Sequence, residues 1–142
     1  MDKRVYTRIM SSTCHCILLR KAARRTTAIY DEALAPMGIS VAQFSLLRNI
    51  ARREPVSLTV LGTVLDLDRS TVGRNVKLLV RRGLVATGTS DDDLREATAS
   101  LTDAGRAILR DAEPAWSAAQ ARIEDALGAD GTAALHRLLD GF

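Results

Sequence analysis

The stretch from Asp68 to Gly83 constrains the fold of this chain more than any other. Asp68 is suited to cap the first turn of a helix, and Gly83 is suited to end it. Apolar residues between them recur at helical spacing, which predicts one buried face made of Val72, Val76, Leu79 and Val80. A second stripe carries Ser70, Arg74, Lys77 and Arg81. The stretch from Arg69 to Arg82 holds five Lys or Arg and no acid. The helix should therefore pack one face on a core and present the other to an anion.

A shorter apolar segment before this helix fits a supporting helix. Ser57 can cap it, and Leu58, Leu61 and Leu65 fall on one side. The residues from Leu65 to Asp68 then form a short turn. Two helices joined in this way, the second one cationic, are typical of a helix-turn-helix, whose second helix enters the DNA major groove. The simpler alternative is an amphipathic helix with a solvated basic face.

The second helix carries side chains that suit base and phosphate contacts. Arg can make two hydrogen bonds with a guanine edge, Asn can do the same with adenine, and Ser or Thr can bind bases or phosphates. The candidate DNA-binding residues on this helix are Arg69, Ser70, Thr71, Arg74, Asn75 and Lys77.

The rest of the chain predicts further helices and one hairpin. Helices are expected over 13–35, capped by Ser12 or Thr13, and over 41–53, capped by Ser40, with a short extended piece at 56–57. Strands at 84–89 and 96–101 would form a wing directly after the cationic helix. A long helix should run from Thr102 to about residue 127, bent or split at Pro114, and a short one should follow. The expected fold is mainly α.

Apolar faces near the two ends of the chain predict a second copy as partner. Ala112, Trp116, Ala119, Ile123 and Ala126 repeat like the seam of a packed helix pair. The final helix adds Leu135, Leu138, Leu139 and Phe142. A small winged domain offers these faces no obvious cover, so a homodimer is the economical expectation. The basic first thirty residues and the acidic last thirty could also lie against each other in such a pair.

Composition excludes several other classes. The chain has 142 residues, 46% of them hydrophobic, with no apolar run long enough to cross a bilayer and no signal-type N-terminus, so we expect a cytoplasmic protein without a membrane partner. The only histidines, His15 and His136, stand in no metal-spacing motif, and no glycine-rich phosphate loop is present. The sequence predicts no enzyme, no catalytic residue, no metal site and no cofactor. A protein-interaction module that does not bind DNA remains an alternative.

The order of these elements resembles the MarR (multiple antibiotic resistance regulator) family of winged-helix transcription factors. The resemblance rests on three motifs: L-x-L-D-R-S-T-V at 65–72, R-R-G-L-V at 81–85 and S-L-T-D-A-G at 100–105. It implies a single unit over 1–142, with a winged helix-turn-helix part at 40–101 and dimerisation helices at 13–36 and 102–142. It also implies a homodimer on an inverted-repeat operator of double-stranded DNA. Such proteins usually repress transcription until a small aromatic or acidic ligand, or an oxidant, releases them.

The predicted wing departs from the family pattern at one position. The family usually has an acid followed by two Arg before the return strand, whereas here Leu94 stands in place of one Arg and Arg95 remains. Arg95 is the wing's candidate for the DNA minor groove. The departure implies weaker or differently aimed wing binding.

Two cysteines near the start of the first predicted helix have three interpretations. Cys14 and Cys16 are two residues apart, so on a helix they point about 200° apart and cannot converge on one metal ion. As packing residues they would be ordinary. The hydroperoxide-sensing branch of the family carries its reactive cysteine near the place of Cys16 and a helix tyrosine near that of Tyr30, which favours a redox switch. On one helix these two residues are about 21 Å apart, so they could meet only across a dimer.

Overall fold

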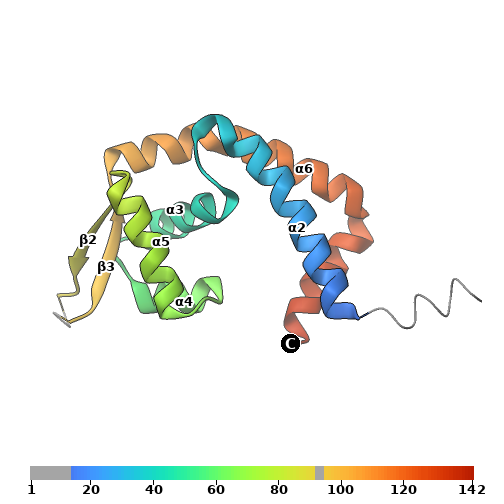
Figure 1. Ribbon diagram of the computed structural model, residues 1–142, viewed down its shortest axis with the longest axis horizontal. Coiled ribbons are helices and arrows are strands. Elements are labelled where there is room, and N and C mark those ends of the chain that lie inside the picture. The colour runs from blue at the N-terminus through green and yellow to red at the C-terminus, as the bar shows by residue number, and fades with distance from the viewer. Residues whose placement is uncertain (1–13, 92–94) are drawn as a thin grey trace, which may run out of the picture.

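The computed structural model describes residues 14–91 and 95–142 and consists of helices with one small sheet. The helices are α2 (His15–Leu34), α3 (Val41–Arg53), α4 (Leu58–Leu65), α5 (Arg69–Arg81) and α6 (Asp103–Asp140), with a 3-10 turn, η1, at Ala35–Met37. The strands are β1 (Val56–Ser57), β2 (Val85–Thr89) and β3 (Ala97–Leu101). Figure 1 shows α2 beside the later part of α6, while α3, α4, α5 and the hairpin form a separate winged part joined by the start of α6. No helix in the described ranges has the length and apolarity needed to cross a membrane.

The predicted helix caps are confirmed for four of the helices. The side chains of Ser40, Ser57, Asp68 and Thr102 accept a hydrogen bond from a backbone N–H in the first turn of α3, α4, α5 and α6, respectively. These bonds satisfy donors that a helix start leaves without an internal partner. The first helix differs, because Cys14 precedes it and makes no side-chain cap. The expected caps, Ser12 and Thr13, lie outside the described residues.

The core lies in the winged part, beneath α5. It is built around fully buried side chains from several elements: Leu34, Phe44, Leu47, Ile50, Leu61, Val72, Val76 and Leu79. The predicted buried face of α5 is thus confirmed except at Val80, which is 36% exposed. Val80 follows Val72 by eight residues, which turns it about 80° around the helix and away from the core.

The sheet forms the predicted wing. β2 and β3 pair antiparallel, with Val85 opposite Leu101 and Thr89 opposite Ala97, and β1 pairs with the other side of β3. The short extended piece at 56–57 is therefore the third strand. The predicted turn falls partly on residues 92–94, which lie outside the described part of the chain.

The last helix breaks after residue 127, as the sequence predicted, but two other expectations about it were wrong. α6 is not split at Pro114; its non-helical residue is Gly128, at φ 69° and ψ 172°, where glycine tolerates a positive φ that other residues avoid. The first part of the predicted seam is also covered within its own chain, since Ala112 and Ala119 are buried and Trp116 stacks on a tyrosine of α2 and a phenylalanine of α3, whereas Ala126 is exposed. The later part of the helix remains uncovered, with Leu127, Leu135 and Leu139 exposed, and Phe142 just after it is exposed as well.

Candidate nucleic-acid interface

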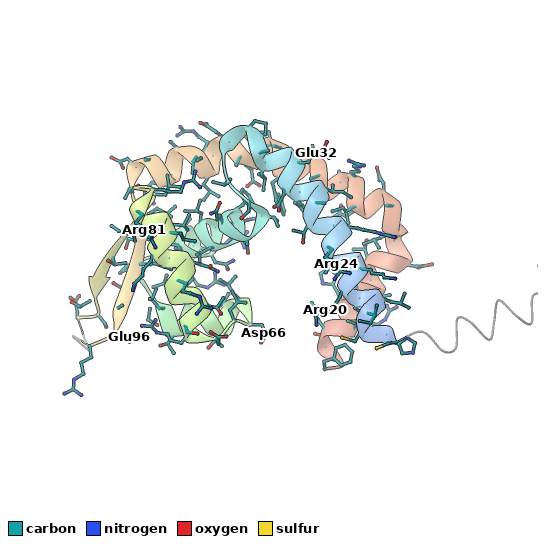
Figure 2. The ribbon with its side chains drawn as sticks, viewed as in Figure 1. Arg20, Arg24, Glu32, Asp66, Arg81 and Glu96 are labelled. Carbon is teal, nitrogen blue, oxygen red and sulfur yellow. The ribbon has the colours of Figure 1, made fainter. Side chains whose placement is uncertain are left out.

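The side of α5 opposite the core carries the predicted polar stripe. Ser70, Arg74, Lys77 and Arg81 are all exposed there, and Arg69 is exposed toward the wing. Figure 2 shows Arg81 near the C-terminal end of α5, Asp66 in the turn before the helix, and Glu96 on the wing. The stripe has no acidic member, so it can approach a polyanion without charge repulsion.

Thr71 and Asn75 are placed differently from the rest of the predicted set. Both are only partly exposed. Asn75 lines a small cavity of about 110 Å³ together with Ser40 and Gln43, on the flank of α5 that faces α3. In the sequence, Thr71 and Asn75 lie beside the exposed stripe of α5 and were therefore grouped with it. In the structure, α3 packs against that side of α5, so Asn75 lies at the margin of the stripe.

Hydrogen bonds order the start of α5. One carboxylate oxygen of Asp68 accepts bonds from the Thr71 N–H and the Ser70 hydroxyl, each over 2.7 Å. The Ser70 hydroxyl first, and then the Thr71 N–H, lower the pKa of Asp68 to about 2. Arg74 donates to the Thr71 hydroxyl oxygen over 3.2 Å. The polar side chains that would meet a DNA base therefore start from defined positions on a capped helix.

The turn before α5 depends on Gly62, which the sequence analysis missed. A Cβ at Gly62 would lie 2.8 Å from the Leu67 carbonyl oxygen, closer than real side chains approach. The Leu67 N–H donates to the Gly62 carbonyl over 2.9 Å, and Asp66 adopts a left-handed φ of 53°. This close approach sets the angle between α4 and α5. A glycine inside an apolar helical segment was the available signal.

Two further side chains, Arg82 and Glu54, hold the interface together through polar contacts, and no sequence motif pointed to these contacts. Arg82, just after α5, donates to Gln43 in the first turn of α3 over 3.4 Å. Glu54, just after α3, accepts a hydrogen bond from the β3 backbone and pairs with Arg106 of α6. These pairs join residues 39 and 52 positions apart, beyond the reach of local sequence patterns.

Arg95, the predicted wing residue, is exposed and lies just before β3. The hairpin closes next to it, where the Ser90 N–H donates to the Glu96 carbonyl over 3.0 Å. The structure thus places the predicted DNA-binding residues on two elements, α5 and the wing.

The predicted redox residues are not brought together within the chain. Cys14 and Cys16 are free, exposed thiols at the start of α2. Tyr30 lies near the other end of α2, where its hydroxyl donates to Gln120 and its ring stacks on Trp116 at 6.5 Å. Burial first, and then the charge of Glu124, raise the pKa of Tyr30. Tyr30 therefore belongs to the contact between α2 and α6.

Comparison with known proteins identifies relatives of this arrangement. A family model described as the MarR family matches residues 37–96. The organic hydroperoxide resistance transcriptional regulator of Bacillus subtilis is 29% identical over 96 residues, and the HTH-type transcriptional repressor NicR of Pseudomonas putida is 32% identical over 92 residues. These alignments cover 68% and 65% of this chain, and span only 65% and 58% of the respective relatives.

A solved structure matches nearly the whole chain. It is the crystal structure of the Mycobacterium tuberculosis transcriptional regulator MosR in complex with DNA, with a TM-score of 0.78 and 31% identity. The match covers 91% of this chain and 98% of that one, so it includes α2 and α6 as well as the winged part. The resemblance noted in the motifs is thereby confirmed, and the chain belongs to the MarR family of winged-helix transcriptional regulators.

Proposed function

We propose that this protein is a sequence-specific, double-stranded DNA-binding regulator of transcription, most simply a repressor. The observation that carries the proposal is the outward face of α5. It is exposed, cationic and free of acids, and it stands on a buried apolar face that fixes its position. The wing supplies a second element beside it. This pairing of a recognition helix with a wing is suited to adjacent grooves of one duplex.

Individual roles follow from position and chemistry. Arg74 and Ser70, at the exposed start of α5, are the proposed base-reading residues, and Asn75 and Thr71 support them from the flank. Arg69 and Lys77 are proposed to bind phosphates, and Arg95 is proposed to reach the minor groove from the wing.

A homodimer would bring two such units to one inverted-repeat operator. The start of α2 exposes Ile17, Leu18 and Leu19, and the end of α6 exposes Leu139 and Phe142, the last at 94%. Figure 1 shows these two ends side by side, away from the winged part. We assign residues 13–36 and 102–142 to dimerisation and residues 40–101 to DNA binding. Paired recognition helices predict half-sites about 34–36 Å apart.

A ligand cleft fits the junction between the two parts. A pocket of about 430 Å³ lies between α3, β3 and α6, with Leu101, Leu109 and Pro114 as apolar lining, Arg106 and Arg110 as cations and Glu113 as an acid. Its apolar lining suits a small aromatic ligand, and Arg110 offers a cation to an acidic group, whereas Arg106 is engaged by Glu54. Because α6 links the dimerisation helices with the winged part, occupancy there would change the spacing of the recognition helices.

The deciding experiment is selection of bound DNA from a random pool by the full chain, at two salt concentrations. We expect an enriched inverted repeat whose affinity falls steeply with salt. The charge-removing variant Arg74→Ala should lose the enrichment, while Arg53→Ala, an exposed arginine on α3 bonded to Asn49, serves as the matched control. A module that only binds protein would enrich no sequence.

A second candidate signal is oxidation of the cysteines. It is favoured by the exposure of both thiols and by similarity to a relative named for organic hydroperoxide resistance. The proposed path starts at the Cys16 thiolate, passes through a sulfenic acid after attack on a peroxide, and ends in a disulfide or mixed disulfide with loss of water. A disulfide between Cys14 and Cys16 would require the start of α2 to unwind.

A gel-shift titration with cumene hydroperoxide tests this second candidate on wild type, Cys14→Ser and Cys16→Ser. We expect release of the wild type and resistance of Cys16→Ser. Unchanged DNA affinity after full thiol oxidation, verified by mass, would leave the small-molecule ligand as the signal. Loss of the response in Cys14→Ser alone would move the sensing role to Cys14.

A further inference from the structure

A groove of about 1000 Å³ separates the recognition helix α5 from the wing. Arg69, Gly73 and Lys77 form its helix wall, and Thr87 and Thr89 of β2 form the opposite wall. The exposed side chain of Val80, beside the buried Val76, makes an apolar floor, and none of the described residues that line the groove is an acid. The groove therefore has cations on one wall, hydroxyls on the other and an apolar base.

Gly73 lies in the middle of the helix wall, and the fold does not require a glycine there. Gly105, by contrast, is required, because a Cβ would lie 2.0 Å from the Leu84 carbonyl oxygen. At Gly73 the backbone is helical, and the nearest atom to an added Cβ is a terminal nitrogen of Arg69, at 3.4 Å. Glycine inside a helix is less stable than alanine, and its use is explained where another molecule approaches the backbone closely.

The free edge of β2, beside this wall, also carries backbone donors. The Ser90 N–H donates to the Glu96 carbonyl just beyond the end of β2. In an antiparallel pair, every second residue forms a hydrogen-bonded pair with the partner strand. With the register of β2 and β3, residues 86 and 88 of β2 are therefore hydrogen-bonded to β3, as residue 90 is. The N–H groups of Thr87 and Thr89 consequently point away from β3. Because β2 is the edge strand of the sheet, these donors face its free edge.

We propose that this groove holds the sugar–phosphate backbone of one operator strand, and that Gly73 is the positioning residue that leaves room for it. The inference rests on the proposed DNA-binding function. If α5 lies in the major groove and the wing in the adjacent minor groove, the strand between those grooves must pass between α5 and β2. Arg69 and Lys77 bind its phosphates, Thr87 and Thr89 add hydroxyl donors, and the deoxyribose rests on the exposed Val80.

The test compares Gly73→Ala and Gly73→Leu with wild type on the selected operator. Gly73→Ala should raise the midpoint of thermal unfolding by about 2–5 °C, since alanine favours the helix. Gly73→Leu fills the groove and should weaken operator binding about tenfold or more, which is the loss of affinity expected when one strong protein–DNA contact is removed. Arg53→Ala, which changes an exposed residue of α3 outside the groove, is the control and should leave binding unchanged.

A scan with single methylphosphonate substitutions in the operator separates a lost backbone contact from a general loss of folding. In wild type, one or two neutralised phosphates should weaken binding, and the same substitutions should have little further effect on Gly73→Leu. Wild-type affinity in Gly73→Leu would overturn the inference while leaving DNA binding intact. An unchanged phosphate profile would also overturn it, because the leucine would then act on base contacts. If added benzoate, as a small aromatic acid probe, released wild type from the operator but not Gly73→Leu with unchanged affinity, the groove would hold a ligand instead. Failure of wild type to bind any DNA would overturn the proposed function as well.

Discussion

The carboxylate of Glu54 accepts a hydrogen bond from the backbone N–H of Leu101 over 2.7 Å, and so ties the end of α3 to the central strand of the wing. Its second oxygen pairs with Arg106 in the first turn of α6. Burial acts to raise the pKa of Glu54, but the Leu101 N–H and the Arg106 guanidinium together outweigh it and hold this pKa below its ordinary value. One side chain thus links three elements on which the wing depends.

We expect Glu54→Ala to lower the free energy of unfolding by about 1–3 kcal/mol, because it removes hydrogen bonds made by a charged group and leaves the Leu101 N–H without this partner. Glu54→Gln should lose less, since its amide oxygen can still accept from Leu101. Urea unfolding at pH 7, followed by circular dichroism, measures both. Equal stability of Glu54→Ala and wild type would contradict this role.

The same carboxylate predicts a pH dependence. A carboxyl whose folded pKa is depressed stabilises the fold above its unfolded pKa, here 4.5, and loses that stabilisation as the pH falls through the lower folded value. The difference in unfolding free energy between wild type and Glu54→Gln should therefore be constant above pH 5 and shrink below pH 4.5. A difference that grows on acidification would show the opposite sign of shift.

The cap of α5 is expected to matter for both stability and DNA binding. Asp68→Ala removes the acceptor of the Thr71 N–H, so it should lower the thermal midpoint and weaken operator binding. Asp68→Asn keeps an acceptor and serves as the control. Because the pKa of Asp68 is about 2, against 3.8 ordinarily, its charged cap should persist down to pH 4 and fade only below that. Thermal scans between pH 3 and 7 on the three proteins check this.

Truncation of Arg74 and truncation of Lys77 should change DNA binding in different ways. Arg74→Ala is expected to cost about 1–3 kcal/mol on the operator and to relax preference at one base position. Lys77→Ala should weaken all sequences alike and reduce the salt dependence, as for a phosphate contact. Fluorescence anisotropy with operator and scrambled duplexes over a salt series distinguishes them. Identical profiles would mean that the base-reading face of α5 has been misassigned.

The exposed end of α6 should decide the oligomeric state. Leu139 is 70% exposed within one chain, so Leu139→Glu should leave the fold of a single chain intact while burying a charge in a dimer. Sedimentation at micromolar concentration is expected to show a dimer for wild type and Leu139→Met, and a 15.4 kDa species for Leu139→Glu. A dimeric Leu139→Glu would place the interface elsewhere.

Local patterns in the sequence determined the helices of the winged part, their caps and the hairpin. Ser40, Ser57, Asp68 and Thr102 act on neighbours only three residues away, and the spacing of Val72, Val76 and Leu79 reports the helix period directly. The cationic face of α5 followed from the same period. These features depend on short-range geometry, which a sequence displays in full.

Only the tertiary structure decided how these elements meet. Trp116 was assigned to a seam between chains but stacks on Tyr30 and Phe44 of its own chain, because α6 folds back across α2 and α3. The sequence predicted that the long helix ends near residue 127, where Gly128 breaks α6, but it also allowed a split at Pro114, through which the helix remains regular. Glu54, Arg82 and the groove beside Gly73 each combine residues from separate elements. Contacts of that kind depend on the packing of the whole chain, and no periodicity within one element specifies them.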